Sequence, residues 1–395
     1  MFLLSTLVFC AIGISLLSIL SVLARLPRLR QLKSRSDVPA TLILPLTGPA
    51  PELDTLIQAL NAQTLQPQRL LICVESEADP AFARAGAAAA LARFPVECVV
   101  AGPASDQSQK CRNQQAALDY LSLDTLAADA VIVFIDGDIV PGPAWLGTLV
   151  SPIAAGTADL VSAHRWQQVT RPRLGAHLVA AVDRAVTLMP RLDMGFARVV
   201  WGGSIAIGAP MARRMDLRAA FDRTLSDDLS LALRASRQNL RIMTRGSLML
   251  PSSNGQALAP AWRFARRQYQ MCRLYRPWLW ALALATPGLR LAGWAAALWL
   301  AFLGAGLVPI AALAALGLIK QFVVGKAARR LNLPDPPAVR AAQLALGLCQ
   351  PVADLFHASA VLAAARTRTV RWGHVDYEVR RTDDIRILKR RPFSS

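Results

Sequence analysis

The chain has 395 residues, enough for one large domain with additions or for two domains. Hydrophobic residues make up 54% of it, yet its formal net charge is +18, so apolar and basic segments must be separated along the sequence. This combination indicates a bilayer with anionic headgroups as a partner rather than nucleic acid. No zinc-finger spacing, RNA-binding aromatic signature or basic heptad region occurs, which also argues against a nucleic-acid partner.

The first segment of the chain is apolar and long enough to cross a bilayer. Residues 1–24 carry no charged side chain, and five basic residues follow within residues 25–35. A secretory signal would place its positive charge before the apolar stretch rather than after it. We therefore expect residues 1–25 to be an uncleaved transmembrane anchor in the inner (cytoplasmic) membrane, with the amino terminus outside and the catalytic domain facing the cytoplasm.

Short apolar runs alternate with longer mixed segments from Val38 to about Leu250, the pattern of a mostly parallel sheet covered by helices. We therefore predict an α/β domain over residues 38–260. Its expected strands start at Ala40, Arg69, Val96, Ala130 and Asp159, and its expected helices include residues 51–63, 80–94 and 110–121. No Gly-rich phosphate loop is present, which argues against a dinucleotide site or a P-loop.

The character of the chain changes after Leu250. Residues 261–285 are rich in arginine and aromatic side chains and are expected to form a basic helix in the membrane interface. Because basic segments stay on the cytoplasmic side, each later apolar stretch is expected to enter and leave on that side, although a single tilted crossing by residues 291–318 is an alternative. The predicted segments are a membrane hairpin or transmembrane segment at 286–325, a membrane-associated or re-entrant segment at 341–365, and a basic cytoplasmic tail at 366–395.

The six cysteines are scattered and form no Cys-x-x-Cys pair. This distribution is typical of reduced thiols in the cytosol rather than of a disulfide framework or a zinc site.

The stretch VIVFIDGDIVPGPAW, residues 131–145, ends a buried-strand pattern in two carboxylates, Asp136 and Asp138. Ligands of open α/β sheets bind at this carboxyl end of the strands, where Glu75 is also expected. Alternation points the two aspartates to the same side, and two negative charges held together favour a bound cation. The alternative interpretation is a solvated acidic turn, because aspartate is common in turns.

A second acidic pair, Asp227 and Asp228, follows Ser226 at the start of a helical pattern. Considered alone, Ser226 would cap a helix and the two carboxylates would favour the positive end of that helix. Upstream, Gly202 and Gly203 precede a strand-like run and mark a place where the backbone approaches either a ligand or a crowded turn.

Together these segments resemble family 2-type glycosyltransferases of the GT-A fold, most closely the branch that contains ceramide glucosyltransferases and hopanoid-associated relatives. The resemblance covers residues 39–276 and extends into the tail. It implies a GT-A domain that binds a nucleotide sugar and a divalent cation, Mn²⁺ or Mg²⁺, the cation being held by the Asp-x-Asp motif. The residues that match donor-side motifs are Glu75, Gln109, Lys110, Asn113, Asp136, Asp138, Gln270 and Arg273.

The same resemblance assigns the catalytic base to Asp228. The residues that it places on the acceptor side are Arg165, Trp166, Gly202, Gly203 and Asp227. Asp227 stands where the family has glutamate, and Leu274 stands where tryptophan is expected, a departure that argues against a processive polysaccharide synthase. In the tail, RWGHVDYEV is similar to the ending of this branch, and the resemblance alone recommends His374 as a residue near the cleft.

The resemblance implies an inverting, metal-dependent glycosyltransferase of glycolipid or sphingolipid metabolism. The cation at Asp136 and Asp138 would neutralise the leaving diphosphate, helped by Arg273, while Asp228 removes the proton from the attacking hydroxyl. The expected donor is a UDP-hexose, and the expected acceptor is the hydroxyl of a membrane lipid such as ceramide.

Two alternatives stay open. A polysaccharide or polyprenyl-phosphate glycosyltransferase is the first, and in the polyprenyl-phosphate case Asp228 would be superfluous because a phosphate acceptor needs no base. A catalytically silent membrane scaffold with a GT-A fold is the second, and it predicts that no nucleotide sugar binds.

Overall fold

The structure is a computed structural model that describes residues 1–29, 37–188 and 200–393. It divides into two compact units. The sheet unit consists of Gln31–Arg165, Arg191–Ser252 and Arg368–Ser395, and the helical unit of Met1–Arg30, Trp166–Pro190 and Ser253–Thr367. Most of the basic segment that follows the predicted anchor, residues 30–36, lies outside the described residues.

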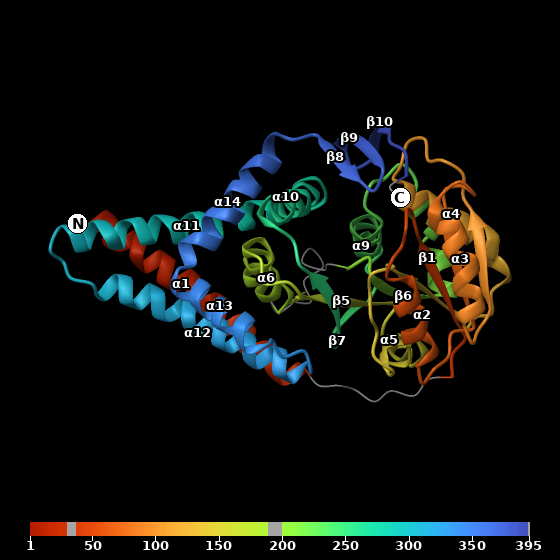
Figure 1. Ribbon diagram of the computed structural model, residues 1–395, viewed down its shortest axis with the longest axis horizontal. Helices are drawn as coiled ribbons and strands as arrows, with labels where there is room; N and C mark the ends of the chain where they lie inside the picture. The colour runs from red at the N-terminus through yellow and green to blue at the C-terminus, as the bar shows by residue number, and fades with distance from the viewer. Residues whose placement is uncertain (30–36, 189–199, 394–395) are drawn as a thin grey trace. The chain divides into compact units, whose positions relative to one another are not determined.

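A seven-stranded sheet forms the core of the α/β fold (Figure 1). Its strands are β1 (Ala40–Pro45), β2 (Arg69–Val74), β3 (Val96–Val100), β4 (Val131–Ile135), β5 (Leu160–Val169), β6 (Ser204–Gly208) and β7 (Ile242–Asn254). The strand order is β3-β2-β1-β4-β6-β5-β7. β1 pairs in parallel with β2 and with β4, and β2 pairs in parallel with β3. β6 runs antiparallel to both β4 and β5. The predicted fold class, α/β with a mostly parallel sheet, is confirmed.

Helices cover both faces of this sheet. They are α2 (Leu53–Asn61), α3 (Pro80–Leu91), α4 (Gln109–Leu121), the short 3₁₀ helix η2 (Leu123–Thr125), α5 (Trp145–Ala154), α7 (Ala209–Arg214), α8 (Leu217–Ala220) and α9 (Asp227–Arg237). Leu42 and Leu44 of β1 pack on one face with α2, α3 and α5. Ile43, between them in sequence, packs on the other face with α4, α7, α8 and α9. The strand alternation therefore gives the sheet two apolar faces, as a buried parallel sheet requires.

The predicted strands agree well with the observed ones at the start of the domain. β2 and β3 begin at the predicted residues, and the strand predicted from Asp159 extends to Val169. β6 was expected only as a strand-like run, and the long strand β7 was not predicted.

The C-terminal residues, predicted only as a basic tail, fold into a second sheet. Its antiparallel strands are β8 (Thr369–Trp372), β9 (Val375–Arg381) and β10 (Asp384–Arg390), in the order β10-β9-β8. Val375, Tyr377 and Val379 are buried while the residues between them are more exposed. This alternation indicates that one face of the small sheet packs against the protein.

The helical unit contains the apolar segments. Its helices are α1 (Phe2–Arg25), the 3₁₀ helix η1 (Leu26–Arg28), α6 (Leu174–Thr187), α10 (Leu258–Tyr275), α11 (Pro277–Phe302), α12 (Val308–Arg330), α13 (Pro337–Leu348) and α14 (Gln350–Arg366). α1, α11 and α12 are long and apolar enough to cross a membrane. α13 and α14 pass the same test together but meet at an angle of 82°.

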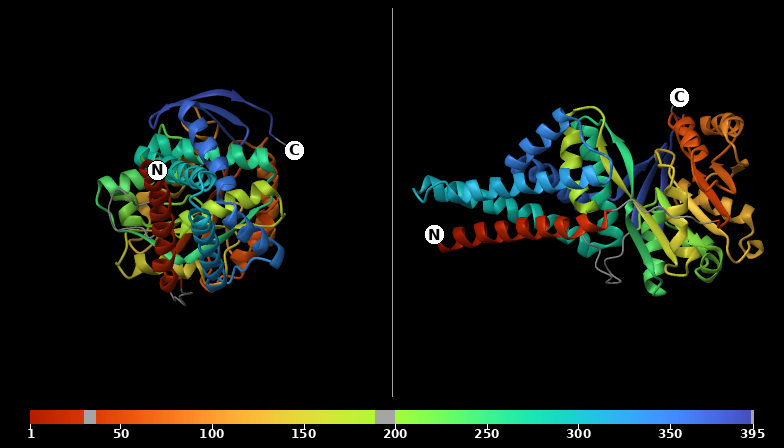
Figure 2. Two further views of the ribbon diagram at one scale, coloured as in Figure 1. Left: turned by 90° about the vertical axis from the view of Figure 1, so that its left-hand side faces the viewer. Right: turned by 90° about the horizontal axis from the view of Figure 1, so that it is seen from below.

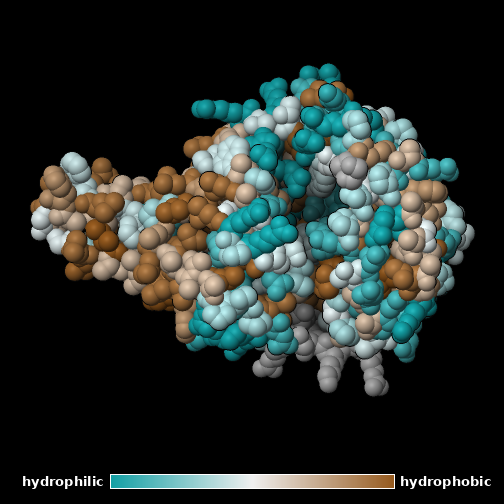
Figure 3. Space-filling model, viewed as in Figure 1, coloured by the Kyte–Doolittle hydropathy of each residue, from teal (hydrophilic) through white to brown (hydrophobic). Residues whose placement is uncertain are grey.

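α1, α11 and α12 lie alongside one another (Figure 2) and pack through small and apolar side chains, among them Ala11, Ala297 and Leu313. Their outer surface is apolar (Figure 3), with side chains such as Phe9 and Trp299 exposed. Apolar side chains turned outward suggest association with a membrane.

Two breaks divide the apolar segments differently from the predicted boundaries. Arg276 separates α10 from α11, so residues 261–285 belong to two helices. Between α11 and α12, Gly304 and Gly306 adopt φ values of 83° and 84°, a region that glycine enters readily. Residues 291–318 are therefore not one continuous helix.

Glycine also permits close packing between α12 and α13. A Cβ atom added to Gly317 would lie 2.0 Å from the carbonyl oxygen of Gly347, which leaves no space for any side chain. On the same helix, a Cβ atom added to Gly325 would have no neighbour within 4 Å.

We therefore expect Gly317→Ala to lower the free energy of unfolding by about 1–3 kcal/mol, because overpacking forces the two helices apart. Gly325→Ala is the matched control on α12 and should be neutral or slightly stabilising. Thermal unfolding in detergent, followed by circular dichroism, measures both. Equal behaviour of the two variants would contradict the packing argument.

Candidate functional site

The two predicted acidic pairs are brought together in the sheet unit by one lysine. Asp136 follows β4, and Asp227 is the first residue of α9. Lys110, in the first turn of α4, places its Nζ 2.7 Å from Oδ1 of Asp136 and 2.9 Å from Oδ2 of Asp227. Three segments far apart in sequence therefore meet at a single ammonium group.

This ion-pair cluster is largely shielded from water. The side chain of Lys110 is 15% exposed and that of Asp227 only 2%. Gln114 donates a second hydrogen bond to Oδ2 of Asp227 at 2.9 Å. Burial alone would lower the pKa of Lys110, but the charges of Asp136 and Asp227 outweigh that effect and raise it well above its usual value. Lys110 therefore stays positively charged and holds the two carboxylates in place.

Asp228, the predicted base, is held in one orientation by three donors. Its Oδ2 accepts a hydrogen bond from the backbone N–H of Gly202 at 3.0 Å. Its Oδ1 accepts from the hydroxyl of Ser226 at 2.5 Å and from the backbone N–H of Leu229 at 2.7 Å. Burial, followed by the negative charge of Asp227, raises the pKa of Asp228, which makes its carboxylate a stronger base.

Ser226 does not have the role that the sequence suggested when α9 was considered alone. It occupies the N-cap position of α9, yet its side chain makes no capping bond to the helix backbone. Its hydroxyl donates to the carboxylate of Asp228 instead. The capping interpretation is therefore wrong for the side chain. Capping would use the Ser226 oxygen as an acceptor, but the backbone N–H of Leu229, in the first turn of α9, donates to the carboxylate of Asp228 instead.

Asp138 is more exposed to solvent than Asp136, the other aspartate of its pair. Lys110 neutralises Asp136, whereas no ion pair to Asp138 occurs within residues 1–29, 37–188 and 200–393. Partial desolvation, then the negative charges of Asp136 and Glu52, raises the pKa of Asp138 to about 6. Gly137, between the two aspartates in sequence, packs closely on Leu46, since an added Cβ atom would lie 2.7 Å from Cδ2 of that side chain.

These properties fit the predicted divalent cation. A cation at Asp136 and Asp138 would offset the repulsion between the two carboxylates, which adds to desolvation in raising the pKa of Asp138. In the part of the chain that the structure describes, no cluster of three or more His, Cys, Asp or Glu side chains could hold a metal ion. The remaining ligands would therefore come from donor phosphates and water, the usual arrangement for Mg²⁺ at one or two carboxylates.

Gly202 and Gly203 form a crowded turn against this cluster. A Cβ atom added to Gly202 would lie 3.0 Å from Nζ of Lys110 and 3.2 Å from Oδ2 of Asp227. One added to Gly203 would collide with the ring of Trp201 at 2.3 Å. A side chain at position 202 would therefore press on the ion pairs, one at position 203 would collide with Trp201, and the predicted role of both glycines on the acceptor side stays a prediction.

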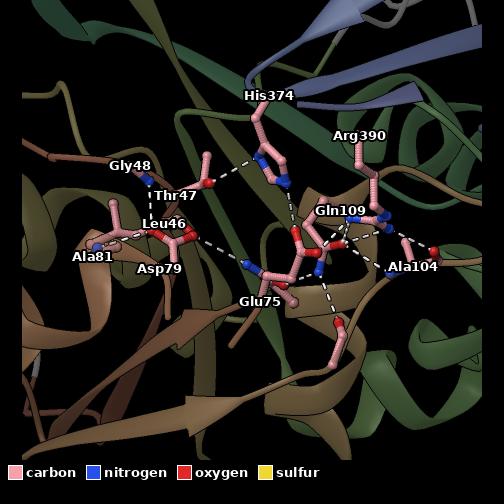
Figure 4. A network of polar contacts seen from close by, with 12 residues as sticks. Leu46, Thr47, Gly48, Glu75, Asp79, Ala81, Ala104, Gln109, His374 and Arg390 are labelled. Atoms are coloured by element: carbon pink, nitrogen blue, oxygen red, sulfur yellow. Dashed lines mark hydrogen bonds and ion pairs between the residues drawn. The ribbon is translucent and has the colours of Figure 1, made fainter. Parts of the chain in front are cut away.

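Glu75, the predicted contact to the nucleotide base, lies directly after β2 in a network of polar contacts (Figure 4). Nε2 of His374 lies 2.8 Å from its Oε2, and Nη1 of Arg390 donates to its Oε1 at 2.5 Å. His374 is also 3.4 Å from the hydroxyl of Thr47 through Nδ1. The C-terminal sheet therefore contacts the carboxyl end of the main sheet at a predicted donor residue.

Asn113 and Gln109 connect the ends of the strands to α4. Nδ2 of Asn113 donates to the carbonyl oxygens of Cys73 and Leu46, at 2.9 and 3.3 Å. Gln109 donates to Oδ1 of Asn113 at 2.9 Å and accepts from the backbone N–H of Ala104 at 2.9 Å. The side chain of Asn113 is buried and fully engaged with protein groups, which indicates that it positions β1, β2 and α4.

The other predicted residues lie in different surroundings. The N–H of Arg165 donates to Nδ1 of His164 at 3.0 Å, and the His164 ring stacks on Trp201. Trp166 is fully buried in the helical unit, with the guanidinium of Arg184 5.1 Å from its ring centre. An acceptor-side role of Arg165 and Trp166 stays a prediction.

Gln270 and Arg273 belong to α10 of the helical unit. Gln270 is fully buried and donates to the carbonyl oxygen of Thr367 at 2.9 Å. This contact ties α10 to the end of α14, and the predicted donor-binding role of both residues stays a prediction.

Sequence reasoning missed Arg390 and Tyr377. Besides pairing with Glu75, Arg390 donates to the carbonyl oxygen of Ala104 at 2.7 Å. The hydroxyl of Tyr377 accepts from the backbone N–H of Gln109, the first residue of α4, at 3.0 Å. The tail motif RWGHVDYEV contains Tyr377 and was the available signal, but nothing in the sequence identified Arg390 among many arginines.

Comparisons with known proteins give a family but little detail. The family described as Glycosyl transferase family 21 matches residues 3–385. No curated protein matches the chain. Among solved structures, mannosyltransferase PcManGT from Pyrobaculum calidifontis, in complex with GDP-Man and Mn²⁺, is 16% identical, with 92% of this chain and 96% of that chain covered and a TM-score of 0.47. Glucosyl-3-phosphoglycerate synthase from Mycobacterium tuberculosis, in complex with Mn²⁺, UDP-glucose and glycerol 3-phosphate, is 16% identical over 60% of this chain and 79% of that chain, with a TM-score of 0.35.

The ion-pair cluster predicts that Lys110→Met lowers the free energy of unfolding by about 3 kcal/mol, because it leaves a buried carboxylate, Asp227, without a countercharge. Lys389→Met, at an exposed position of β10, is the control and should change stability by less than about 0.5 kcal/mol. Denaturant unfolding measures both. Similar losses for the two variants would rule out a central role of the cluster in stability.

The raised pKa of Asp138 predicts a pH dependence of stability. Because its folded pKa of about 6 exceeds the usual value, its contribution to stability is largest at low pH and is lost as the pH rises through about 6. Asp138→Asn should therefore stabilise the metal-free protein above pH 6, by no more than about 1 kcal/mol because water screens the group. Added Mn²⁺ should raise the melting temperature of the wild type but not that of Asp138→Asn. Equal stabilisation of both proteins by Mn²⁺ would place the cation elsewhere.

Proposed function

Because the chain belongs to glycosyl transferase family 21, we propose that this glycosyltransferase transfers a hexose from a UDP-sugar to the hydroxyl of a membrane lipid such as ceramide, with inversion at the sugar and with Mn²⁺ or Mg²⁺ bound. One observation carries the proposal. Lys110 joins the acidic pair expected to bind the donor, Asp136 and Asp138, to the pair that contains the proposed base, Asp227 and Asp228. Donor and acceptor chemistry would therefore take place in one compact site.

The cation would be held by Asp138 and Asp136. When bound, it supplies positive charge to the leaving diphosphate without any proton transfer. Asp138 is the exposed member of the pair, and a divalent cation would offset the repulsion by Asp136 that, after desolvation, raises its pKa. The solved mannosyltransferase and glucosyl-3-phosphoglycerate synthase contain Mn²⁺ and a nucleotide sugar, which agrees with this assignment.

Asp228 would act as the general base. As the acceptor oxygen attacks the anomeric carbon, its proton passes to a carboxylate oxygen of Asp228 while the bond to the diphosphate breaks. The donors Gly202, Ser226 and Leu229 fix the carboxylate, and its partial exposure leaves room for an acceptor hydroxyl. A single displacement of this kind inverts the anomeric configuration.

The membrane-lipid acceptor is proposed from the helical unit. α1, α11 and α12 could span a membrane, and their outward faces are apolar. An enzyme that is held in a bilayer and uses a soluble donor meets lipid hydroxyls at the membrane surface. We place the protein in the inner membrane with the sheet unit in the cytoplasm, because basic residues follow α1.

The test is lipid-dependent release of UDP by the full-length protein in detergent with Mn²⁺, using UDP-hexoses and ceramide. We expect Asp228→Asn to reduce transfer at least about 100-fold while UDP still binds, because a general base contributes to the chemical step. Asp138→Ala should abolish UDP binding and transfer together. Asp222→Asn, at an exposed aspartate of the same unit, is the control and should retain activity.

Full activity of Asp228→Asn would favour a phosphate acceptor, which needs no base. A folded wild type that binds no nucleotide sugar would favour a scaffold instead.

A further inference from the structure

The C-terminal sheet provides two residues to the carboxylate of Glu75, which has little access to water. The side chains of Glu75 and His374 are 9% and 8% exposed, and that of Arg390 is 28% exposed. His374 lies in the turn between β8 and β9, and Arg390 is the last residue of β10. Figure 4 shows both side chains reaching from these strands toward Glu75.

These contacts fix the direction of the carboxylate without filling all of its acceptor positions. A carboxylate offers about four acceptor positions on its two oxygens. Arg390 occupies a position on Oε1, and His374 lies against Oε2. A ring N–H of a nucleobase would need one of the remaining positions on a carboxylate that does not rotate.

The same strands also tie down the loop beside Glu75. Arg390 donates to the carbonyl oxygen of Ala104, and the hydroxyl of Tyr377 accepts from the N–H of Gln109. Ala104 in turn donates to the side chain of Gln109. The sheet thus holds Glu75, the 101–108 loop and the start of α4 in one arrangement.

We infer that Arg390 and His374 are positioning residues for nucleobase recognition, and that β8–β10 are part of the nucleoside subsite of the donor. Arg390 and His374 act through Glu75 and do not contact the diphosphate, which Asp136, Asp138 and their cation would bind. The inference rests on the proposed function, since it requires a nucleotide donor.

The test distinguishes binding of the nucleobase from binding of the diphosphate. UDP, GDP and inorganic pyrophosphate are titrated calorimetrically, with Mn²⁺, into the full-length protein in detergent. We expect Arg390→Gln to weaken UDP binding about tenfold or more, the usual effect of losing a charged hydrogen bond. Pyrophosphate binding should change less than about twofold, because no nucleobase is present. The preference for UDP over GDP should fall in parallel.

Arg391→Gln is the matched control. Arg391 is adjacent in sequence and pairs with Asp376 within the small sheet, at 2.7 Å. Its loss perturbs the sheet without touching Glu75, so UDP and pyrophosphate binding should both stay close to wild type. Arg390→Lys should recover part of the lost UDP affinity.

A double-mutant cycle with Glu75→Gln tests whether Arg390 acts through Glu75. Adding Arg390→Gln to Glu75→Gln should cause little further loss of UDP affinity. The inference is overturned if Arg390→Gln weakens the binding of UDP and of pyrophosphate equally, or if it weakens the binding of neither. It is also overturned if the effects of Arg390→Gln and Glu75→Gln on UDP affinity are additive. A wild type that binds pyrophosphate but no nucleoside diphosphate would overturn the proposed function, and this inference with it.

Discussion

The ammonium group of Lys110 is the interaction on which the site depends. It joins Asp136, at the end of a central strand, to Asp227, at the start of a helix, and without it these buried or half-buried carboxylates would repel one another. The glycine at 202 follows from the same interaction, because any larger residue would press on the ion pairs. One positive charge therefore fixes the relative position of β4, α4 and α9.

This arrangement gives the two aspartates of each acidic pair different surroundings. The first aspartate of each pair, Asp136 and Asp227, is bound to Lys110. The second, Asp138 or Asp228, has a raised pKa and at least partial exposure. Adjacent or nearly adjacent carboxylates thus acquire different properties: one is paired with the lysine, and the other has a raised pKa and contact with solvent, as its proposed role requires. Two carboxylates of equal burial and equal partners could not divide the two tasks in this way.

Local sequence patterns were sufficient to predict β2, β3 and the position of Asp136 at the end of a strand. Each of these features depends on an apolar run and the turn beside it, which together occupy only a few residues. The contacts between distant segments were not predictable in this way. Arg390 lies 315 residues after Glu75, and nothing around either residue identifies the other. The direction of β6 also depends on its neighbours, β4 and β5, rather than on its own sequence. For Ser226, the local signal for a helix cap was present, but the backbone N–H of Leu229 donates to the carboxylate of Asp228 and not to the serine oxygen.

The basic excess of the chain suggested a membrane surface, yet several of its cations serve buried acids. Lys110 pairs with Asp136 and Asp227, and Arg390 pairs with Glu75. In the helical unit, Arg184 pairs with Asp335 and Arg290 with Asp354. A buried carboxylate without a countercharge or other donors is strongly destabilising, and each of these acids obtains its countercharge from a cation elsewhere in the chain. The net charge of the chain therefore does not show which cations form internal ion pairs. The cations at the candidate site, Lys110 and Arg390, are among those paired with carboxylates.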